Sequence, residues 1–300
     1  MIKLQTAVET GKSSVGLSLK DRITVLGSCF ADNVGSGLAE CGFDVLVNPF
    51  GTLYNPVSIC NSVVRLDSGL PFTEDDCTEM GAGAGRICSF SHHTSFSRAT
   101  AEEFLANANE VLASASAFWK NSNKVIITLG TAWCFRYDAT GETVSNCLKR
   151  PAAEFTRYRL DVSFTEMLLE RMVSRHPDKQ FIFTVSPIRH LADGAHGNQL
   201  SKSVLLLAVE QLCRKFSDPG AVRCEYFPAY EIVLDELRDY RFYAEDMCHP
   251  TAQVADYIRE RFVDFAVPAD EHGKIADNMK AFRQSKHVPG GIGKNHLHKI

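Results

Sequence analysis

Long hydrophobic runs are missing from this sequence. No stretch approaches the about 18 consecutive apolar residues that a membrane-spanning helix requires. The first residues, Met1 to Glu9, lack the apolar segment of a secretory signal peptide. We therefore expect no membrane partner and a cytoplasmic location.

A strong charge of either sign is also missing. The 300 residues carry a formal net charge of −4, which gives no reason to expect nucleic acid or an anionic membrane as a partner. With 45% hydrophobic and 23% charged residues, the composition is typical of a soluble globular protein. A small-molecule or glycan substrate is the expected partner, and the sequence does not indicate the oligomeric state.

The ten cysteines include no C-x-x-C pair, which argues against a structural zinc site built on that spacing. Several lie in segments with an apolar period, and without a secretory signal we predict that they are reduced and mostly buried. Examples are Cys41, Cys60, Cys134 and Cys213. No metal or cofactor is expected. We interpret His92 with His93, and His190 with His196, as hydrogen-bonding loop residues, with a metal site as the alternative.

Strands alternate with helices five times between residues 23 and 265. Short apolar runs predict the strands, at 23–26, 43–47, 125–129, 181–185 and 222–227. Helical periodicity and capping residues predict the helices, at 30–41, 55–65, 101–119, 162–175, 201–216, 230–237 and 252–265. The crossovers are long enough for parallel pairing, so we predict an α/β fold with a mainly parallel, doubly wound sheet.

Two further segments fall outside this alternation. Residues 131–148 predict a small hairpin insertion that turns at 138–141, where a glycine follows Asp138. Residues 267–300 form a polar tail, and the stretch from Val288 to Lys294 has no core pattern. We expect this tail to be loosely ordered, and the folded domain to cover residues 20–266.

The first strand ends in a sharp turn into a helix, and a serine occupies the turn. Gly27 and Ser28 follow the apolar run from Ile23 to Leu26. Such a turn lies at the carboxyl edge of the sheet, beside the unpaired N–H groups of the helix, where ligands bind and negative charge is stabilised. We interpret Ser28 as a nucleophile, and its alternative role is that of a helix N-cap.

A general base for this serine is predicted near the other end of the chain. Asp246 and His249 lie three residues apart in a loop that enters the last predicted helix. The carboxylate can reach the Nδ1–H of the imidazole there, which leaves Nε2 free to take a proton from Ser28. Because this loop follows the last strand, it opens on the same edge of the sheet as Ser28. The alternative is a pair of solvated loop residues.

Five blocks, in order, resemble one protein family. They are residues 27–31 (GSCFA), 48–56 (NPFGTLYNP), 129–133 (LGTAW), 184–190 (TVSPIRH) and 239–250 (DYRFYAEDMCHP). They are similar to the GSCFA family, which is grouped with the SGNH (GDSL-like) hydrolases, over roughly residues 20–265. The resemblance implies a three-layer α/β/α fold with a five-stranded, flavodoxin-like sheet. It also implies a catalytic serine in the first block and a D-x-x-H pair in the last, which Ser28, Asp246 and His249 match.

The same resemblance implies an oxyanion site, and here the sequence departs from the pattern. The implied donors are the N–H of Ser28, Gly51 in the second block and an asparagine in the third. The third block instead reads Gly130, Thr131, Ala132, Trp133. We expect Thr131, Asn55 or Asn146 to supply the last donor. Further candidates for substrate contacts are Gly130, His93, Lys149, Arg189 and His190. Leu148 stands where relatives carry a histidine, so substrate choice is expected to differ.

These residues predict a serine-dependent ester hydrolase. It would remove or transfer an acyl, acetyl-like group on a carbohydrate or other polyol through an acyl-enzyme on Ser28. Hydrolysis and acyl transfer use the same groups, so the sequence does not separate them. The alternative is a catalytically idle domain that keeps the fold and binds a glycan or acylated ligand. The missing third-block asparagine favours that alternative.

Overall fold

The central sheet has five parallel strands, as the sequence predicts. The computed structural model describes residues 6–218, 223–287 and 297–298. The strands are β1 (Arg22–Gly27), β2 (Asp44–Val47), β5 (Lys124–Leu129), β9 (Gln180–Val185) and β10 (Cys224–Tyr226). They lie in the order β10-β9-β5-β1-β2, which is the 2-1-3-4-5 order of a flavodoxin-like sheet. A two-residue strand, β11 (Leu297–His298), adds parallel to β2.

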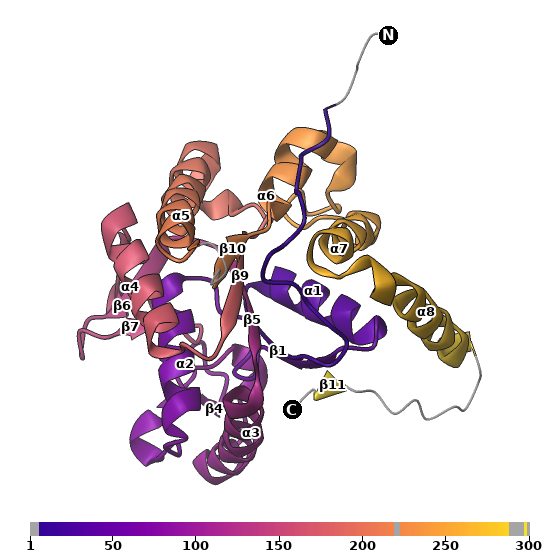
Figure 1. The fold of residues 1–300 in the computed structure, drawn as a ribbon. Helices are drawn as coiled ribbons and strands as arrows, with labels where there is room; N and C mark the ends of the chain where they lie inside the picture. Colours follow the sequence, from indigo (N-terminus) through magenta and orange to yellow (C-terminus); the bar gives the residue numbers. More distant parts are fainter. Residues whose placement is uncertain (1–5, 219–222, 288–296, 299–300) are drawn as a thin grey trace.

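Helices cover both faces of this sheet, so the fold has three layers (Figure 1). One face carries α2 (Pro56–Ser68), α3 (Ala101–Asn121), α4 (Val162–Arg175) and α5 (Gly194–Lys215). The other carries α1 (Cys29–Glu40), α7 (Ala252–Ala266) and α6 (Ala229–Glu231), which continues as a π-helical turn (Ile232–Leu237). Short 3-10 turns lie at Glu74–Asp76, Thr94–Phe96, Ala152–Glu154, Leu191–Asp193, Tyr240–Phe242 and Ala269–Glu271.

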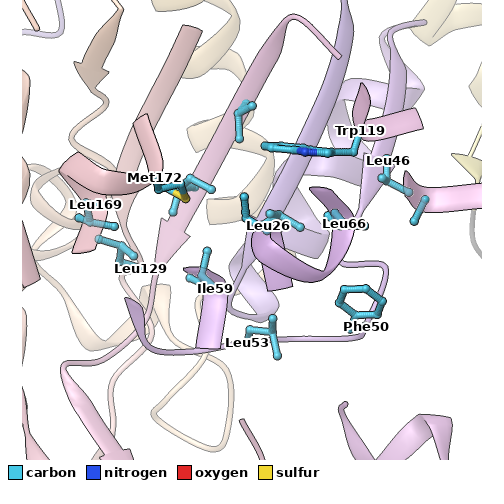
Figure 2. Close-up of a cluster of buried hydrophobic side chains, with 14 of the residues drawn as sticks. Leu26, Leu46, Phe50, Leu53, Ile59, Leu66, Trp119, Leu129, Leu169 and Met172 are labelled. Carbon is cyan, nitrogen blue, oxygen red and sulfur yellow. The ribbon is translucent and has the colours of Figure 1, made fainter. Parts of the chain in front are cut away.

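Each strand supplies side chains to both cores because successive residues point to opposite faces. On β1, Val25 packs in the core beside α1 and α7, whereas Leu26 packs beside α2 and α3. Figure 2 shows Leu26 among side chains of that second core, with Ile59 and Leu66 from α2 and Trp119 from α3. Burial on both faces explains why the central strands are continuous apolar runs.

The predicted hairpin insertion is one part of a three-stranded antiparallel sheet. Strand β6 (Trp133–Tyr137) pairs with β7 (Thr143–Val144) and with β8 (Phe155–Arg159). The sequence does not predict β8, because its residues are a mixture of aromatic and polar types and its side chains are exposed or half-buried. A second, two-stranded ribbon joins β3 (Thr78–Glu79) to β4 (Ile87–Cys88).

The first part of the C-terminal tail is helical, which differs from the loose packing that we expected. Helix α8 (His272–His287) buries Ile275, and Asn278 donates a hydrogen bond to the carbonyl of Cys41 at the end of α1 (2.9 Å). The stretch from Val288 to Lys294 lies outside the described ranges, so that part of the prediction is untested. No helix in the described ranges is long and apolar enough to cross a membrane.

Candidate active site

Gly27 allows the end of β1 to lie directly against β5. Its φ is +139°, and a Cβ atom at this position would overlap the carbonyl oxygen of Thr128. No other residue fits this conformation and this space. The N–H of the next residue, Ser28, donates to the same carbonyl of Thr128 at 3.1 Å. The strand ladder therefore continues to the first residue of the turn.

The hydroxyl of Ser28 points into the protein. Its Oγ accepts a hydrogen bond from the N–H of Phe30 at 3.3 Å, so Ser28 is the N-cap of α1. The same atom lies 3.4 Å from Oγ1 of Thr128, and the residue is only 2% exposed. These two partners occupy the hydroxyl that we expected to act as the nucleophile.

The predicted pairing of Asp246 with His249 is present in the loop before α7. Oδ2 of Asp246 lies 2.6 Å from Nδ1 of His249, while Oδ1 accepts the N–H groups of Cys248 (2.8 Å) and His249 (3.0 Å). The N–H of His249, and then its imidazole, lower the pKa of Asp246 to about 2. The carboxylate is thus ionised, and a neutral imidazole bonded to it through Nδ1 presents an unprotonated Nε2.

This Nε2 faces the residue after Ser28. It lies 3.9 Å from Sγ of Cys29, the first residue of α1. The sulfur also lies 3.9 Å from the hydroxyl of Tyr54, and the side chain is half-buried. Burial raises the pKa of the Cys29 thiol, whereas the hydrogen bond with Tyr54 acts in the opposite direction.

A cavity of about 740 Å³ opens beside Cys29 and His249. Its wall includes five of the other predicted site residues, namely Asn55, Thr131, Asn146, Arg189 and His190. Six further predicted residues are not part of the wall, namely Ser28, Gly51, Gly130, His93, Lys149 and Asp246. The carboxyl-edge loops therefore meet as expected, but only part of the predicted set reaches the cavity.

The predicted oxyanion donors Gly51 and Thr131 already have partners. The N–H of Gly51 donates to the carbonyl of Asn48 (2.8 Å), and that of Thr131 donates to Tyr54 (2.9 Å). The hydroxyl of Thr131 lies 3.0 Å from Oγ of Ser201. Together with the Ser28 N–H described above, all three predicted N–H groups are used by the fold.

Asn55 lines the cavity, and its side-chain amide nitrogen, Nδ2, is a hydrogen-bond donor that the fold does not use within the described ranges. It is the N-cap of α2, and its Oδ1 accepts the N–H of Ser58 at 2.9 Å. This bond fixes the orientation of the amide, and Nδ2 donates to no other group in the described part of the chain. The residue is 6% exposed, so the donor is largely shielded from water.

Arg189, in the fourth block, supports the Asp246–His249 loop. The N–H of Arg189 donates to the carbonyl of Cys248 at 3.1 Å, and its guanidinium donates to Met247 at 3.0 Å. The ring of the next residue, His190, lies 6.4 Å from that of Tyr54. Burial lowers the pKa of His190 to about 4, so this imidazole is neutral at pH 7.

The remaining histidine candidate, His93, and its neighbour His92 both have structural surroundings. His93 lies against Gly51, and its Nδ1 contacts Ser95 at 3.0 Å. Its neighbour His92 is buried among phenylalanine rings and contacts Ser89 at 2.6 Å. Burial lowers the pKa of His92 to about 3. Within the described ranges, no group of three or more histidine, cysteine, aspartate or glutamate residues is arranged to hold a metal ion.

Lys202 was not predicted, although the sequence carried a signal for it. Its Nζ donates to the carbonyls of Gly130 and Ser186, both at 2.7 Å, and the side chain is buried. It thereby links α5 to the carboxyl ends of both β5 and β9. Burial lowers the pKa of its amine to about 7. Lys202 lies three residues before Leu205, on the apolar stripe of α5, which is an unusual position for a lysine.

Comparisons with known proteins give one match. A model of the GSCFA family matches residues 22–262, from β1 to α7, and so includes both the turn at Ser28 and the loop of His249. No curated protein and no solved structure matches the chain.

Proposed function

The chain belongs to the GSCFA family, and from this premise we propose that it is an SGNH-type enzyme that cleaves or transfers an ester-linked acyl group. The acyl group is small and acetyl-like, and the alcohol part is a carbohydrate or another polyol. The observation that carries the proposal is the 2.6 Å contact between Asp246 and His249 at the wall of the cavity.

This pair provides the proton transfers that an acyl transfer needs. Ionised Asp246 fixes the tautomer and the orientation of His249, and Nε2 takes a proton from a nucleophile on the Ser28–Cys29 turn. When the tetrahedral intermediate collapses, Nε2–H returns the proton to the leaving alcohol. A water or a second alcohol then attacks the acyl-enzyme with help from the same imidazole.

Stabilisation of the oxyanion is expected from two sources beside the turn. The N-terminus of α1 provides the N–H of Cys29, which donates to no main-chain carbonyl in the described ranges, and the positive end of a helix dipole. Asn55 provides Nδ2, which takes the place of the missing third-block asparagine. One such donor contributes about 3 kcal/mol to the transition state in known acyl transferases.

The cavity suits an alcohol larger than the acyl group. Its volume of about 740 Å³ is within the usual range for small-molecule sites, and Trp133 and Phe135 give it flat apolar walls. Arg157 lies over the Trp133 ring at 4.1 Å and pairs with Asp193, so this aromatic wall is fixed in place. A polyol ring can pack on such a wall while Asn146 binds its hydroxyls.

The test is turnover of p-nitrophenyl acetate and of acetylated sugars by wild type and by His249→Ala. We expect wild-type hydrolysis and a fall of about 10²-fold to 10⁴-fold in kcat for the variant. Added sugar acceptors distinguish transfer from hydrolysis by formation of a new ester. If folded wild type cleaves none of these esters, the proposal fails, and the binding-domain alternative stands.

A further inference from the structure

Two nucleophilic side chains adjoin each other at the end of β1, and only one faces the base. Sγ of Cys29 lies 3.9 Å from Nε2 of His249, and Cys29 lines the cavity. We propose that Cys29 rather than Ser28 is the nucleophile, so that the acyl-enzyme is a thioester. This inference rests on the proposed acyl-transfer function and changes its chemistry.

Ser28 has a different role in this geometry. Its hydroxyl caps α1 through the N–H of Phe30 and contacts Thr128, and the residue is 2% exposed. To reach a substrate, the hydroxyl would have to leave both partners and rotate out of the protein interior. Ser28 thus positions the helix that presents Cys29.

The available N–H donors also favour Cys29. A nucleophile's own N–H commonly serves the oxyanion, and the N–H of Ser28 is used by the carbonyl of Thr128. The N–H of Cys29 is at the first position of α1 and donates to no main-chain carbonyl in the described ranges. It lies beside its own sulfur, where its hydrogen bond lowers the pKa of the thiol. With Nδ2 of Asn55, it forms a two-donor oxyanion site.

The state of the thiol explains why a base is needed. Burial has the largest effect on Cys29 and raises its pKa, so the thiol rests in its neutral form at pH 7. Proton transfer to His249 creates the thiolate as the sulfur attacks an electrophile. Asp246 stabilises the imidazolium that results, and the hydroxyl of Tyr54, 3.9 Å from the sulfur, stabilises the thiolate.

The reaction balances without any further reagent. The thiolate attacks the ester carbonyl carbon, a C–S bond forms, and the carbonyl electron pair moves to oxygen. The pair then returns, the C–O bond to the alcohol breaks, and His249 gives its Nε2 proton to the leaving oxygen. A water or alcohol, deprotonated by Nε2, attacks the thioester, and its collapse releases the acid or new ester and regenerates the thiol.

The first experiment compares Cys29→Ala, Cys29→Ser and Ser28→Ala on the same ester. We expect kcat to fall at least about 10²-fold for Cys29→Ala and Cys29→Ser. Ser28→Ala should keep most of its turnover and show a lower melting temperature, because it loses a helix cap. Cys77→Ser, which alters a thiol outside the cavity, is the matched control. Wild-type turnover by folded Cys29→Ala, with loss in folded Ser28→Ala, would overturn the inference.

The second experiment identifies the acylated atom by mass spectrometry of acid-quenched enzyme. The acyl group should map to Cys29 and be removed by neutral hydroxylamine, as a thioester is. An acyl group on Ser28 would overturn the inference but leave the esterase function intact.

A third measurement does not depend on turnover, so it separates the two failures. The alkylation of Cys29 by iodoacetamide should be at least about tenfold faster in wild type than in His249→Ala, because the imidazole generates the thiolate. Equal rates would overturn the role of Cys29 even if esterase activity is found. Absence of esterase activity with a His249-dependent alkylation rate would instead contradict the proposed substrate class.

Discussion

Oδ1 of Asn55 accepts the N–H of Ser58 at 2.9 Å. This bond leaves the amide nitrogen of Asn55 available to a ligand in the cavity that Asn55 lines. The two ends of one side chain thus have separate roles, one in the stability of α2 and one in the site. A substitution can therefore remove one role and keep the other.

Asn55→Asp should preserve the helix cap and remove the donor. Aspartate caps helices as well as asparagine does, so we expect the free energy of unfolding to change by less than about 0.5 kcal/mol. The kcat for ester cleavage should fall by about 10²-fold to 10³-fold, because an oxyanion donor is replaced by a negative charge. Asn61→Asp, on an exposed position of α2, adds the same charge and should keep wild-type kcat. Unchanged turnover in Asn55→Asp would exclude this residue from the oxyanion site.

Asp246→Asn keeps His249 but removes the carboxylate that orients it, so this variant tests the orienting role of Asp246. An amide cannot provide the ionised acceptor that fixes the Nδ1–H tautomer, so kcat should fall by about 10²-fold to 10⁴-fold. Since the pKa of Asp246 is lowered to about 2, its carboxylate stays ionised from pH 4 to 9. The measurement is kcat as a function of pH over that range. Asp239→Asn, which changes an exposed cap of a 3-10 turn, is the control and should leave kcat unaffected.

Gly27→Ala should unfold or strongly destabilise the protein. The new methyl group would overlap the carbonyl of Thr128, and the φ of +139° is strained for alanine, so the loss is about 3 kcal/mol or more. Gly273→Ala is a matched control in α8, where the added methyl group meets nothing and helix propensity improves. Urea denaturation of both variants measures the difference. Similar midpoints for the two would show that the contact between β1 and β5 can relax.

His92 should make the fold sensitive to acid. Its folded pKa of about 3 lies below the 6.5 of an unfolded histidine, so the unfolded state binds more protons between these values. This residue adds no pH dependence above pH 6.5, and stability falls as the pH drops from 6.5 toward 3. The full effect is at most about 5 kcal/mol. His92→Phe should flatten this dependence, which urea midpoints at pH 7.5 and 4.5 measure. Exposed His196→Gln is the control, and an equally steep fall in His92→Phe would contradict the assignment.

Much of the fold could be predicted because its central strands are buried on both faces. The runs at Ile23 to Leu26 and Val125 to Leu129 are mostly apolar on both faces, so they predict buried strands whichever helices cover them. The strand at Phe155–Arg159 lacks that signal, since its neighbours in the small sheet leave it half-exposed. Helix α5 begins at Gly194, seven residues before the predicted start, because its first two turns carry few apolar residues.

The site was predictable where chemistry depends on local spacing. Asp246 and His249 are three residues apart, and one turn of loop brings them together. The choice between Ser28 and Cys29 depends on which of two adjacent side chains points into the cavity, and this is set by packing against Thr128 on β5. The directions of the N–H groups at Gly51 and Thr131 likewise depend on distant carbonyls, which no local pattern specifies.

The buried amine of Lys202 allows local opening of the fold to be measured chemically. Amine-reactive reagents acetylate surface lysines at once, but the nitrogen of Lys202 is enclosed between two carbonyls at 2.7 Å. Because Lys202 belongs to α5, a reagent reaches it when α5 moves away from the carboxyl ends of β5 and β9. The acetylation rate of this single residue, followed by peptide mass, therefore measures how often α5 separates from this edge of the sheet in the intact protein.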